Sequence, residues 1–153
     1  MARTPVRVAG GTRAAGLELE GFDELFKLLG NLPERLAKGA LRGAPTAAAK
    51  VVRDEIRINA RGRFPTSRKL VRAIKHRRAS TRGDDFRAFV FIERGHGAQY
   101  DAFYWRFLEY GTVKMSAKPY VRPGIDNSRG KVGDAMADHI RKRFDKAVEK
   151  GKV

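Results

Sequence analysis

Residues 107–123 read Phe-Leu-Glu-Tyr-Gly-Thr-Val-Lys-Met-Ser-Ala-Lys-Pro-Tyr-Val-Arg-Pro, between an aromatic segment and a C-terminal segment with helical spacing. Gly111 can take the left-handed conformation that ends a helix. Pro119 and Pro123 hold the chain extended and then allow a new helix at its first turn. This stretch therefore predicts a bend that joins a short aromatic helix to a C-terminal helix.

The C-terminal helix is expected to be regular only over Lys131–Glu149, where apolar residues recur at helical spacing. The glycines at positions 124, 130 and 133 weaken the start of this helix by roughly 1 kcal/mol each relative to alanine. Glu109 and Arg122 are candidates for an ion pair across the bend, and a solvated pair of this kind contributes little stability.

Half of the chain's aromatic residues lie within residues 100–120. If 103–110 is helical, Phe103, Phe107 and Tyr110 share one face, Tyr104 and Leu108 lie on the next, and Trp105 points elsewhere. A short helix that is apolar nearly all round must be enclosed on most sides. A neighbouring subunit and a single well-packed core are both interpretations of this pattern.

The segment before the aromatic residues predicts helices followed by strands. A strand is expected at Leu17–Glu20, a helix from Phe22, and a longer helix from about Pro33 to Arg57 with a face of small residues. Pro45 should kink this longer helix or begin a new one. A loop is expected over 61–69, and Leu70–Arg78 fits a short helical turn or a strand. A strand over Phe86–Ile92 is mostly apolar on both faces, which predicts that helices or a neighbouring subunit cover both.

These elements predict an α+β fold, with a small antiparallel sheet packed against a long N-terminal helical segment and a C-terminal helix. The length of 153 residues is that of one domain. We expect a flexible basic arm over 1–16, the domain over 17–149 with a basic loop region at 57–82, and a tail at 150–153. No apolar stretch has the length of a signal or membrane segment, which predicts a soluble intracellular protein or part of a particle assembled there.

Positive charge is concentrated in one part of the chain. Residues 53–82 carry 11 basic and 2 acidic residues, which is +9 of the total +16. Such a run is a solvated loop or a contact surface for an anionic partner. The candidate contact residues for DNA or an acidic partner are Arg57, Arg61, Arg63, Arg68, Lys69, Arg72, Lys75, Arg77, Arg78 and Arg82.

Signals for catalysis are weak. The chain has no cysteine, and its three histidines have no acidic or histidine partner at metal-ligand spacing. His139 fits the apolar side of the last helix, and Glu93, Asp101 and Glu109 are better explained by charge compensation than by acid–base chemistry. We therefore expect no catalytic residue, no metal, no cofactor and no enzymatic activity.

The stretch 107–123 resembles the E-[FY]-G-T … A-x-P-[FY]-x-R-P signature of the tail-component family of long-tailed bacteriophages, also called the tail-completion or head–tail joining family. The matching residues are Glu109, Tyr110, Gly111, Thr112, Ala117, Pro119, Tyr120, Arg122 and Pro123. Residues 19–25 and 64–74 are similar to two other stretches of that family, although the second lacks the usual glycine and serine. The likeness spans about residues 17–149.

The resemblance implies a virion protein that forms a ring, typically of six copies, in the neck or at the head-proximal end of the tail. Such a ring joins the tail to head-completion proteins around the DNA conduit. Its neighbours would be a head-completion or adaptor ring and tail-terminator or tail-tube proteins, with transient contact to double-stranded DNA and no membrane. The motif residues, together with Phe103, Tyr104, Trp105 and Phe107, are then candidates for subunit interfaces.

The basic stretch has three interpretations within such a ring: it lines the lumen and faces DNA, it docks on an acidic neighbouring ring, or it is a solvated loop. Tight DNA binding would oppose DNA passage, because affinity built on many phosphate contacts is large and depends steeply on salt. A free-standing nucleic-acid-binding protein is the main alternative function, and a hydrolase or nuclease has only scattered carboxylates in its favour.

Overall fold

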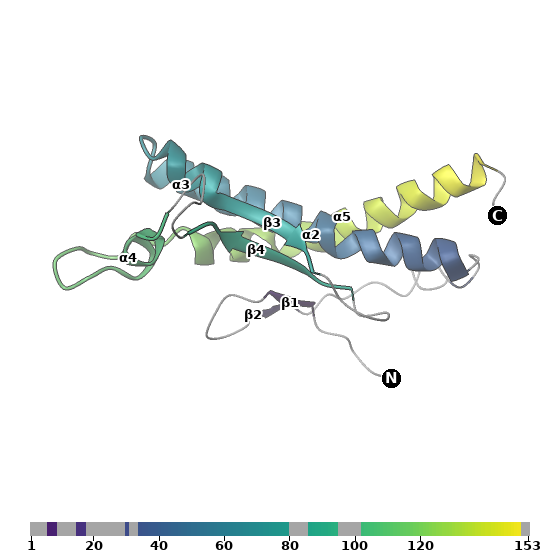
Figure 1. Cartoon of the computed structure of the whole chain (residues 1–153), viewed down its shortest axis with the longest axis horizontal. Helices are drawn as coiled ribbons and strands as arrows, with labels where there is room; N and C mark the ends of the chain where they lie inside the picture. The colour runs from purple at the N-terminus through teal and green to yellow at the C-terminus, as the bar shows by residue number, and fades with distance from the viewer. Residues whose placement is uncertain are drawn as a thin grey trace.

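The computed structural model describes residues 6–8, 15–17, 30, 34–79, 86–94 and 102–150. Two long helices, α2 (Glu34–Arg63) and α5 (Val121–Val148), lie side by side and run in opposite directions along the molecule (Figure 1). A two-stranded sheet packs against α2, and the short helices α3 (Arg68–Ala73) and α4 (Trp105–Tyr110) lie at the end of the molecule where α2 ends and α5 begins.

Helix α2 buries a row of mostly small side chains that recur at every fourth position. The row consists of Ala40, Ala44, Ala48, Val52, Ile56 and Ala60. Residues four apart lie one above the other on a helix, so they form a narrow ridge against which a second helix can pack closely. Pro45 lies within α2 without ending it, so that one helix runs through the position where the sequence predicts a kink or a new start.

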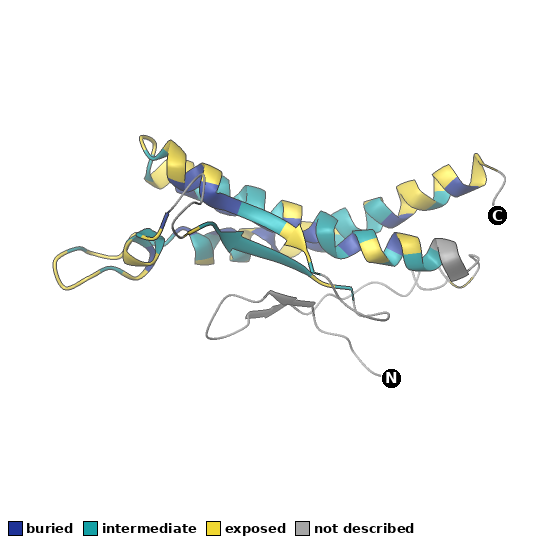
Figure 2. Cartoon of the chain, in the orientation of Figure 1, coloured by how far each residue is buried: buried dark blue, intermediate teal, exposed yellow. Residues whose placement is uncertain are grey.

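Helix α5 presents a matching row to α2, which includes Gly124, Ser128, Val132 and Ile140. A Cβ atom on Gly124 would lie 2.7 Å from the Cα atom of Ile56, so the two backbones approach most closely there. The start predicted at Lys131 is therefore wrong, because α5 begins at Val121 and Gly124 serves this close approach. Figure 2 shows buried residues along the sides of α2 and α5 that face each other.

The sheet consists of β3 (Ile74–Arg78) and β4 (Ala88–Ile92), paired antiparallel with Ile74 opposite Ile92 and Arg78 opposite Ala88. Opposed residues share a face. Val90 and Ile92 accordingly pack against the core cluster that includes Ile74. Every β4 residue is only half-buried, so the described part of this chain does not by itself enclose the strand on both faces, and its coverage by a neighbouring subunit stays a prediction.

Several boundaries differ from the sequence prediction. Helix α2 continues to Arg63 and α3 begins at Arg68, so only 64–67 remain of the loop predicted at 61–69. The ambiguous stretch Leu70–Arg78 divides between the last residues of α3 and strand β3. Most of the described part of 57–82 is therefore helix and strand rather than loop.

The N-terminal region contains β1 (Val6–Val8) and β2 (Ala15–Leu17), which pair antiparallel. Strand β1 lies within the segment predicted as an arm, and β2 overlaps the strand predicted at Leu17–Glu20 by one residue. The helix predicted from Phe22 falls outside the described residues, and the domain limits stay predictions. The α+β class with a small antiparallel sheet and two long flanking helices is confirmed.

The core divides into two clusters along the α2–α5 pair. The larger cluster lies beneath the sheet, α3 and α4, and its fully buried members include Leu70, Ile74, Tyr120 and Val132. The smaller cluster joins Ala40 and Ala44 of α2 to Ile140 of α5, with the half-buried Phe144 packed against them. The large side chains of the core therefore gather at the end that holds α3 and α4.

Candidate interaction site

The stretch 107–123 folds as a tight connection between α4 and α5. Gly111 ends α4 with φ 77°, and a Cβ atom there would lie 2.8 Å from both the Met115 carbonyl oxygen and the Ala117 nitrogen. The prediction that Gly111 ends the helix with a positive φ is confirmed, but its ψ of −179° gives an extended conformation that is open almost only to glycine, not the left-handed helical one. Its surroundings also leave no space for a side chain. After a turn closed by the Thr112–Met115 bridge, the Lys118 N–H donates to the Leu108 carbonyl oxygen at 2.9 Å.

Glu109 caps the start of α5. Its carboxylate accepts hydrogen bonds from the backbone N–H groups of Tyr120, Val121 and Arg122 at 2.8, 2.9 and 3.1 Å, and only 4% of the residue is exposed. The first N–H groups of a helix have no partner within the helix and favour a negative charge. This cap allows α5 to begin at Val121, and it ties α4 to α5 through one side chain.

The predicted ion pair between the Glu109 and Arg122 side chains is wrong. Of Arg122, Glu109 contacts only the backbone N–H group. The Arg122 guanidinium instead lies 5.1 Å from the centre of the Tyr110 ring. A solvated carboxylate could be removed at little cost in stability, but the Glu109 carboxylate is buried against the start of α5. Its removal should therefore destabilise the protein.

Tyr120 anchors the connection on its buried side. The residue is fully buried and its ring packs edge-on against Phe64 at 5.7 Å between ring centres. Burial, followed by the charges of Glu109 and Tyr104, raises the pKa of the Tyr120 hydroxyl well above its usual value, so the ring stays neutral. Tyr120 is therefore a core residue in this chain.

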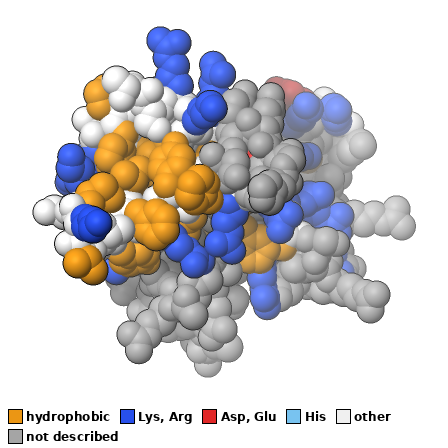
Figure 3. Space-filling model, turned by 60° about the vertical axis from the view of Figure 1, so that its left-hand side comes forward, with side chains coloured by type: hydrophobic (Ala, Val, Ile, Leu, Met, Phe, Trp, Pro, Cys, Tyr) orange, Lys and Arg blue, Asp and Glu red, His pale blue; other side chains and the backbone are white. Residues whose placement is uncertain are grey.

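The aromatic segment is divided by α4 into a buried and an exposed side. Tyr104, Trp105 and Leu108 pack against the large core cluster. On the other side, Phe103, Phe107 and Tyr110 are 66%, 50% and 60% exposed, and Val113 at the tip of the following turn is fully exposed. We call Phe103, Phe107, Tyr110 and Val113 the aromatic patch. Figure 3 shows hydrophobic side chains gathered at this end of the molecule, with Lys and Arg side chains around them.

The structure thus brings the motif residues together at the α4–α5 junction and gives them different roles. Glu109, Gly111 and Tyr120 maintain the geometry of the junction, whereas Phe107 and Tyr110 present apolar surface to solvent. Phe103, Phe107 and Tyr110, which helical spacing assigns to one face, are all exposed, although α4 begins only at Trp105, and the sequence pattern did not indicate Val113. Contact of these residues with another chain stays a prediction.

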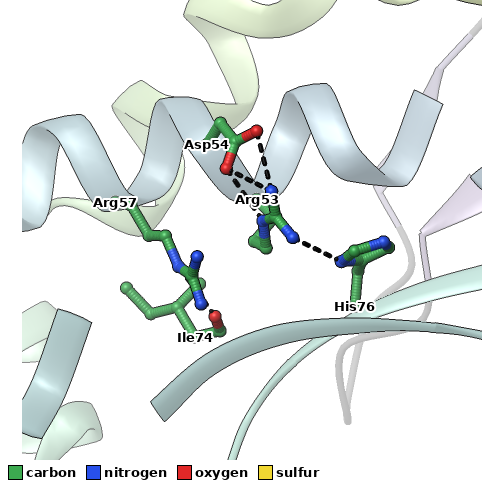
Figure 4. Close-up of polar contacts among 5 residues, drawn as sticks. All are labelled: Arg53, Asp54, Arg57, Ile74 and His76. Atoms are coloured by element: carbon green, nitrogen blue, oxygen red, sulfur yellow. Dashed lines mark hydrogen bonds and ion pairs between the residues drawn. The ribbon is translucent and has the colours of Figure 1, made fainter. Parts of the chain in front are cut away.

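The basic stretch is partly used within the fold. The Arg53 guanidinium bonds both carboxylate oxygens of Asp54 and donates to the His76 Nδ1 atom at 2.9 Å, and the Arg57 Nε–H donates to the Ile74 carbonyl oxygen at 3.0 Å (Figure 4). Burial and then the charge of Arg53 lower the pKa of His76, which fits a neutral ring accepting that hydrogen bond. These contacts join α2 to β3.

The remaining cations of the stretch have different surroundings. Lys75 forms an ion pair with Glu93 at 2.7 Å, and Arg77 lies over the Phe91 ring at 5.3 Å. Arg82 lies outside the described residues. The exposed group at the end of α2 and along α3 consists of Arg61, Arg63, Arg68, Lys69 and Arg72, and Arg78 is exposed at the end of β3. The ten candidates therefore do not form one uniform surface.

The described ranges hold no candidate metal site and no candidate membrane span. No three His, Asp or Glu side chains of these residues converge in a way that could hold a metal ion. None of the described helices is long and apolar enough to cross a bilayer. His139 packs between the long helices, where its ring faces Gly43, in keeping with its predicted packing role.

Comparison with known proteins identifies the family. A family model described as "Bacteriophage HK97-gp10, putative tail-component" matches residues 23–111, which is more than half of the chain. No curated protein and no solved structure matches the chain. The matched region contains α2, the sheet and α4, and it ends at Gly111. The chain therefore belongs to the HK97-gp10-like family of bacteriophage tail components.

Proposed function

We propose that the protein is a structural virion component that forms a ring, of six copies, in the phage neck or at the head-proximal end of the tail. In this position it joins the tail to head-completion proteins around the DNA conduit and has no catalytic role. Assembly takes place in the host cytoplasm, and the neighbours are an adaptor or head-completion ring on one side and tail-terminator or tail-tube proteins on the other.

The observation that carries this proposal is the aromatic patch on a member of a tail-component family. Phe107 and Tyr110 are at least half exposed although they lie on a helix that Glu109 and Gly111 hold in a defined position. Several large apolar side chains left exposed close together in the chain, on and beside a helix that is held in place, indicate a contact with another protein. Sibling copies or adjoining virion proteins would cover them in the assembled particle.

A free-standing nucleic-acid-binding protein is the second candidate, and the exposed cations of α3 favour it. Its expected properties differ from those of a neck ring. Such a protein would bind duplex DNA as a monomer, with an affinity that falls by about 10³–10⁵ between 50 and 200 mM salt for six to ten phosphate contacts. A ring component would bind DNA only loosely, because the genome must slide past it.

An amber mutation in the phage gene for this chain tests the proposal, with a plasmid copy of the wild-type gene as the control. We expect electron micrographs of the mutant lysate to show DNA-filled heads and separate tails, and the plasmid copy to restore joined particles. Joined, infectious particles without the chain would contradict the proposal. Loss of DNA replication or packaging, with tails still joined to heads, would favour the nucleic-acid alternative.

A further inference from the structure

The aromatic patch and the exposed cations of α3 lie at the same end of the molecule. The Ser67 hydroxyl, directly before α3, lies 3.2 Å from the Tyr104 hydroxyl, directly before α4. The Tyr104 ring in turn contacts the Phe103 ring edge-on at 5.7 Å between ring centres. Arg68 and Lys69 follow Ser67 in the chain, so exposed cations and exposed aromatic rings lie on two segments that contact each other at this end of the molecule. We call the surface of these two segments the α3–α4 end.

Further cations lie beside the aromatic rings themselves. The Arg122 guanidinium lies 5.1 Å from the Tyr110 ring centre, and the Arg106 guanidinium lies 5.5 Å from the Trp105 ring centre. An apolar centre with a charged rim that is rich in Arg and aromatic residues is typical of protein–protein interfaces. The composition of the α3–α4 end therefore fits a protein partner.

Four of the cations at this end form no ion pair with another described residue. These are Arg61, Arg63, Arg68 and Lys69. Arg61 and Arg63 lie in the last turn of α2, where positive charge interacts favourably with the C-terminal end of the helix dipole. Arg68 and Lys69 stand in the first turn of α3, where the same effect is unfavourable. Both side chains are exposed and can be solvated by water and counterions, but an anionic group nearby would stabilise them further.

The described residues of a second copy of this chain are a poor source of such a group. Among the described acidic side chains, Asp54, Glu55 and Glu93 form ion pairs on or near α2 and the sheet, and Glu109 caps α5. Asp126 and Asp138 pair with arginines of α5. The exposed acids that remain, Asp134, Asp145 and Glu149, are interspersed with Lys142, Arg143 and Lys146. The described surface thus offers no acidic area to match the cations.

Duplex DNA could compensate the charge but not the aromatic patch. Phosphates and sugars present almost no apolar surface to a helix face, so Phe103, Phe107 and Tyr110 would remain exposed next to DNA. A partner that covers the aromatic patch and also compensates the cations needs apolar and acidic surface side by side.

We propose that the α3–α4 end docks on a different virion protein, in an apolar pocket that takes Phe107 and Tyr110 and is rimmed by carboxylates. This inference rests on the proposed function, and it adds the surface and the chemistry of the partner. The aromatic rings supply most of the affinity, as buried aromatic anchors do in other interfaces. The cations of α3 and Arg122 steer and orient the contact.

A photo-crosslinking amino acid, p-benzoylphenylalanine, placed at position 107 of the full chain tests this proposal in assembled particles. The chain is supplied from a plasmid to the amber-mutant phage, and crosslinked peptides from purified particles are identified by mass spectrometry. The same amino acid at position 148 is the control, because Val148 is exposed to a similar degree at the last residue of α5, away from α3 and α4. We expect position 107 to crosslink to a peptide of another virion protein that lies within a cluster of Asp or Glu residues, and position 148 not to reach that peptide.

Charge reversal adds a second measurement. The double variant Arg68→Glu, Lys69→Glu should lower the yield of that crosslink by about two- to fivefold for each charge. The matched control Lys142→Glu, Arg143→Glu makes the same charge change at exposed positions of α5 and should leave the yield unchanged. Equal thermal melting of both variants shows that the loss does not come from unfolding.

The outcomes separate this inference from the proposed function. Crosslinks from position 107 to another copy of this chain, to DNA, or to no partner in particles that contain the protein would overturn the docking proposal and leave the structural role intact. Absence of the chain from joined particles would overturn both. Equal loss of crosslinking in the α5 control would show that net charge, not the α3–α4 end, is responsible.

Discussion

The two ends of the α2–α5 pair are built from different side chains. At one end, the large cluster encloses Leu70, Ile74 and Tyr120 beneath α3, α4 and the sheet. At the other end, Ala40 and Ala44 meet Ile140 between two helices, in a cluster with no contribution from the sheet. The end with the large buried side chains is therefore also the end that carries the exposed aromatic patch. The aromatic patch is thus presented by the part of the molecule that the large core cluster supports.

The largest expected effect compares one substitution at the two ends. Ile74→Ala should lower the free energy of unfolding by about 4 kcal/mol, and Ile140→Ala by about 2 kcal/mol, within the range for buried isoleucines. Ile74 is fully buried among large side chains, whereas the cavity at Ile140 lies between helices that can move together. Urea unfolding followed by circular dichroism measures both. Equal losses would show that the two clusters are packed alike.

Removal of the charge that caps α5 should have the next largest effect. Glu109→Gln keeps the size of the side chain but places an amide NH₂ group where backbone N–H groups need an acceptor. We expect a loss of about 2–3 kcal/mol in the free energy of unfolding. The control Asp126→Asn removes an exposed carboxylate from the same helix and should cost less than about 0.5 kcal/mol.

Glycine substitutions separate the helix contact from helix propensity. A Cβ atom at Gly124 would meet the Ile56 backbone, so Gly124→Ala should destabilise the protein by about 1–3 kcal/mol. Gly130 has no atom within 4 Å of such a Cβ and is exposed on the same helix, so Gly130→Ala should stabilise by about 0.5–1 kcal/mol. Thermal melting of the pair checks the signs, and a gain at position 124 would contradict the close approach of the helices.

The smallest expected effect is a dependence of stability on pH. Burial, followed by the charges of Arg143 and Lys142, lowers the pKa of His139, and burial with Arg53 lowers that of His76. As the pH falls below about 6.5, these histidines take up protons in the unfolded chain before they do so in the folded one. The free energy of unfolding that they contribute above that pH is therefore lost on acidification. Unfolding between pH 8 and 5 should show this decline, and His139→Leu should reduce its slope. An unchanged slope would mean that His139 does not titrate differently in the two states.

Local patterns predicted much of the fold, and contacts between distant segments account for the errors. The end of α4 at Gly111 and the grouping of Phe103, Phe107 and Tyr110 follow from spacing alone. The start of α5 could not be predicted in this way, because it depends on the Glu109 cap and on the packing of Gly124 against Ile56. The family motif identified the positions that matter, but not that Glu109 and Tyr120 are buried while Phe107 is exposed.

The central claim is that the α3–α4 end is covered by another virion protein at the junction of head and tail. A cryo-electron microscopy reconstruction of that junction in the phage that encodes this chain tests it most directly. The account predicts a ring of this protein in which Phe107 and Tyr110 enter a pocket of a neighbouring protein lined by carboxylates. A ring whose aromatic patch faces solvent or the DNA lumen, or a junction without this chain, would contradict it.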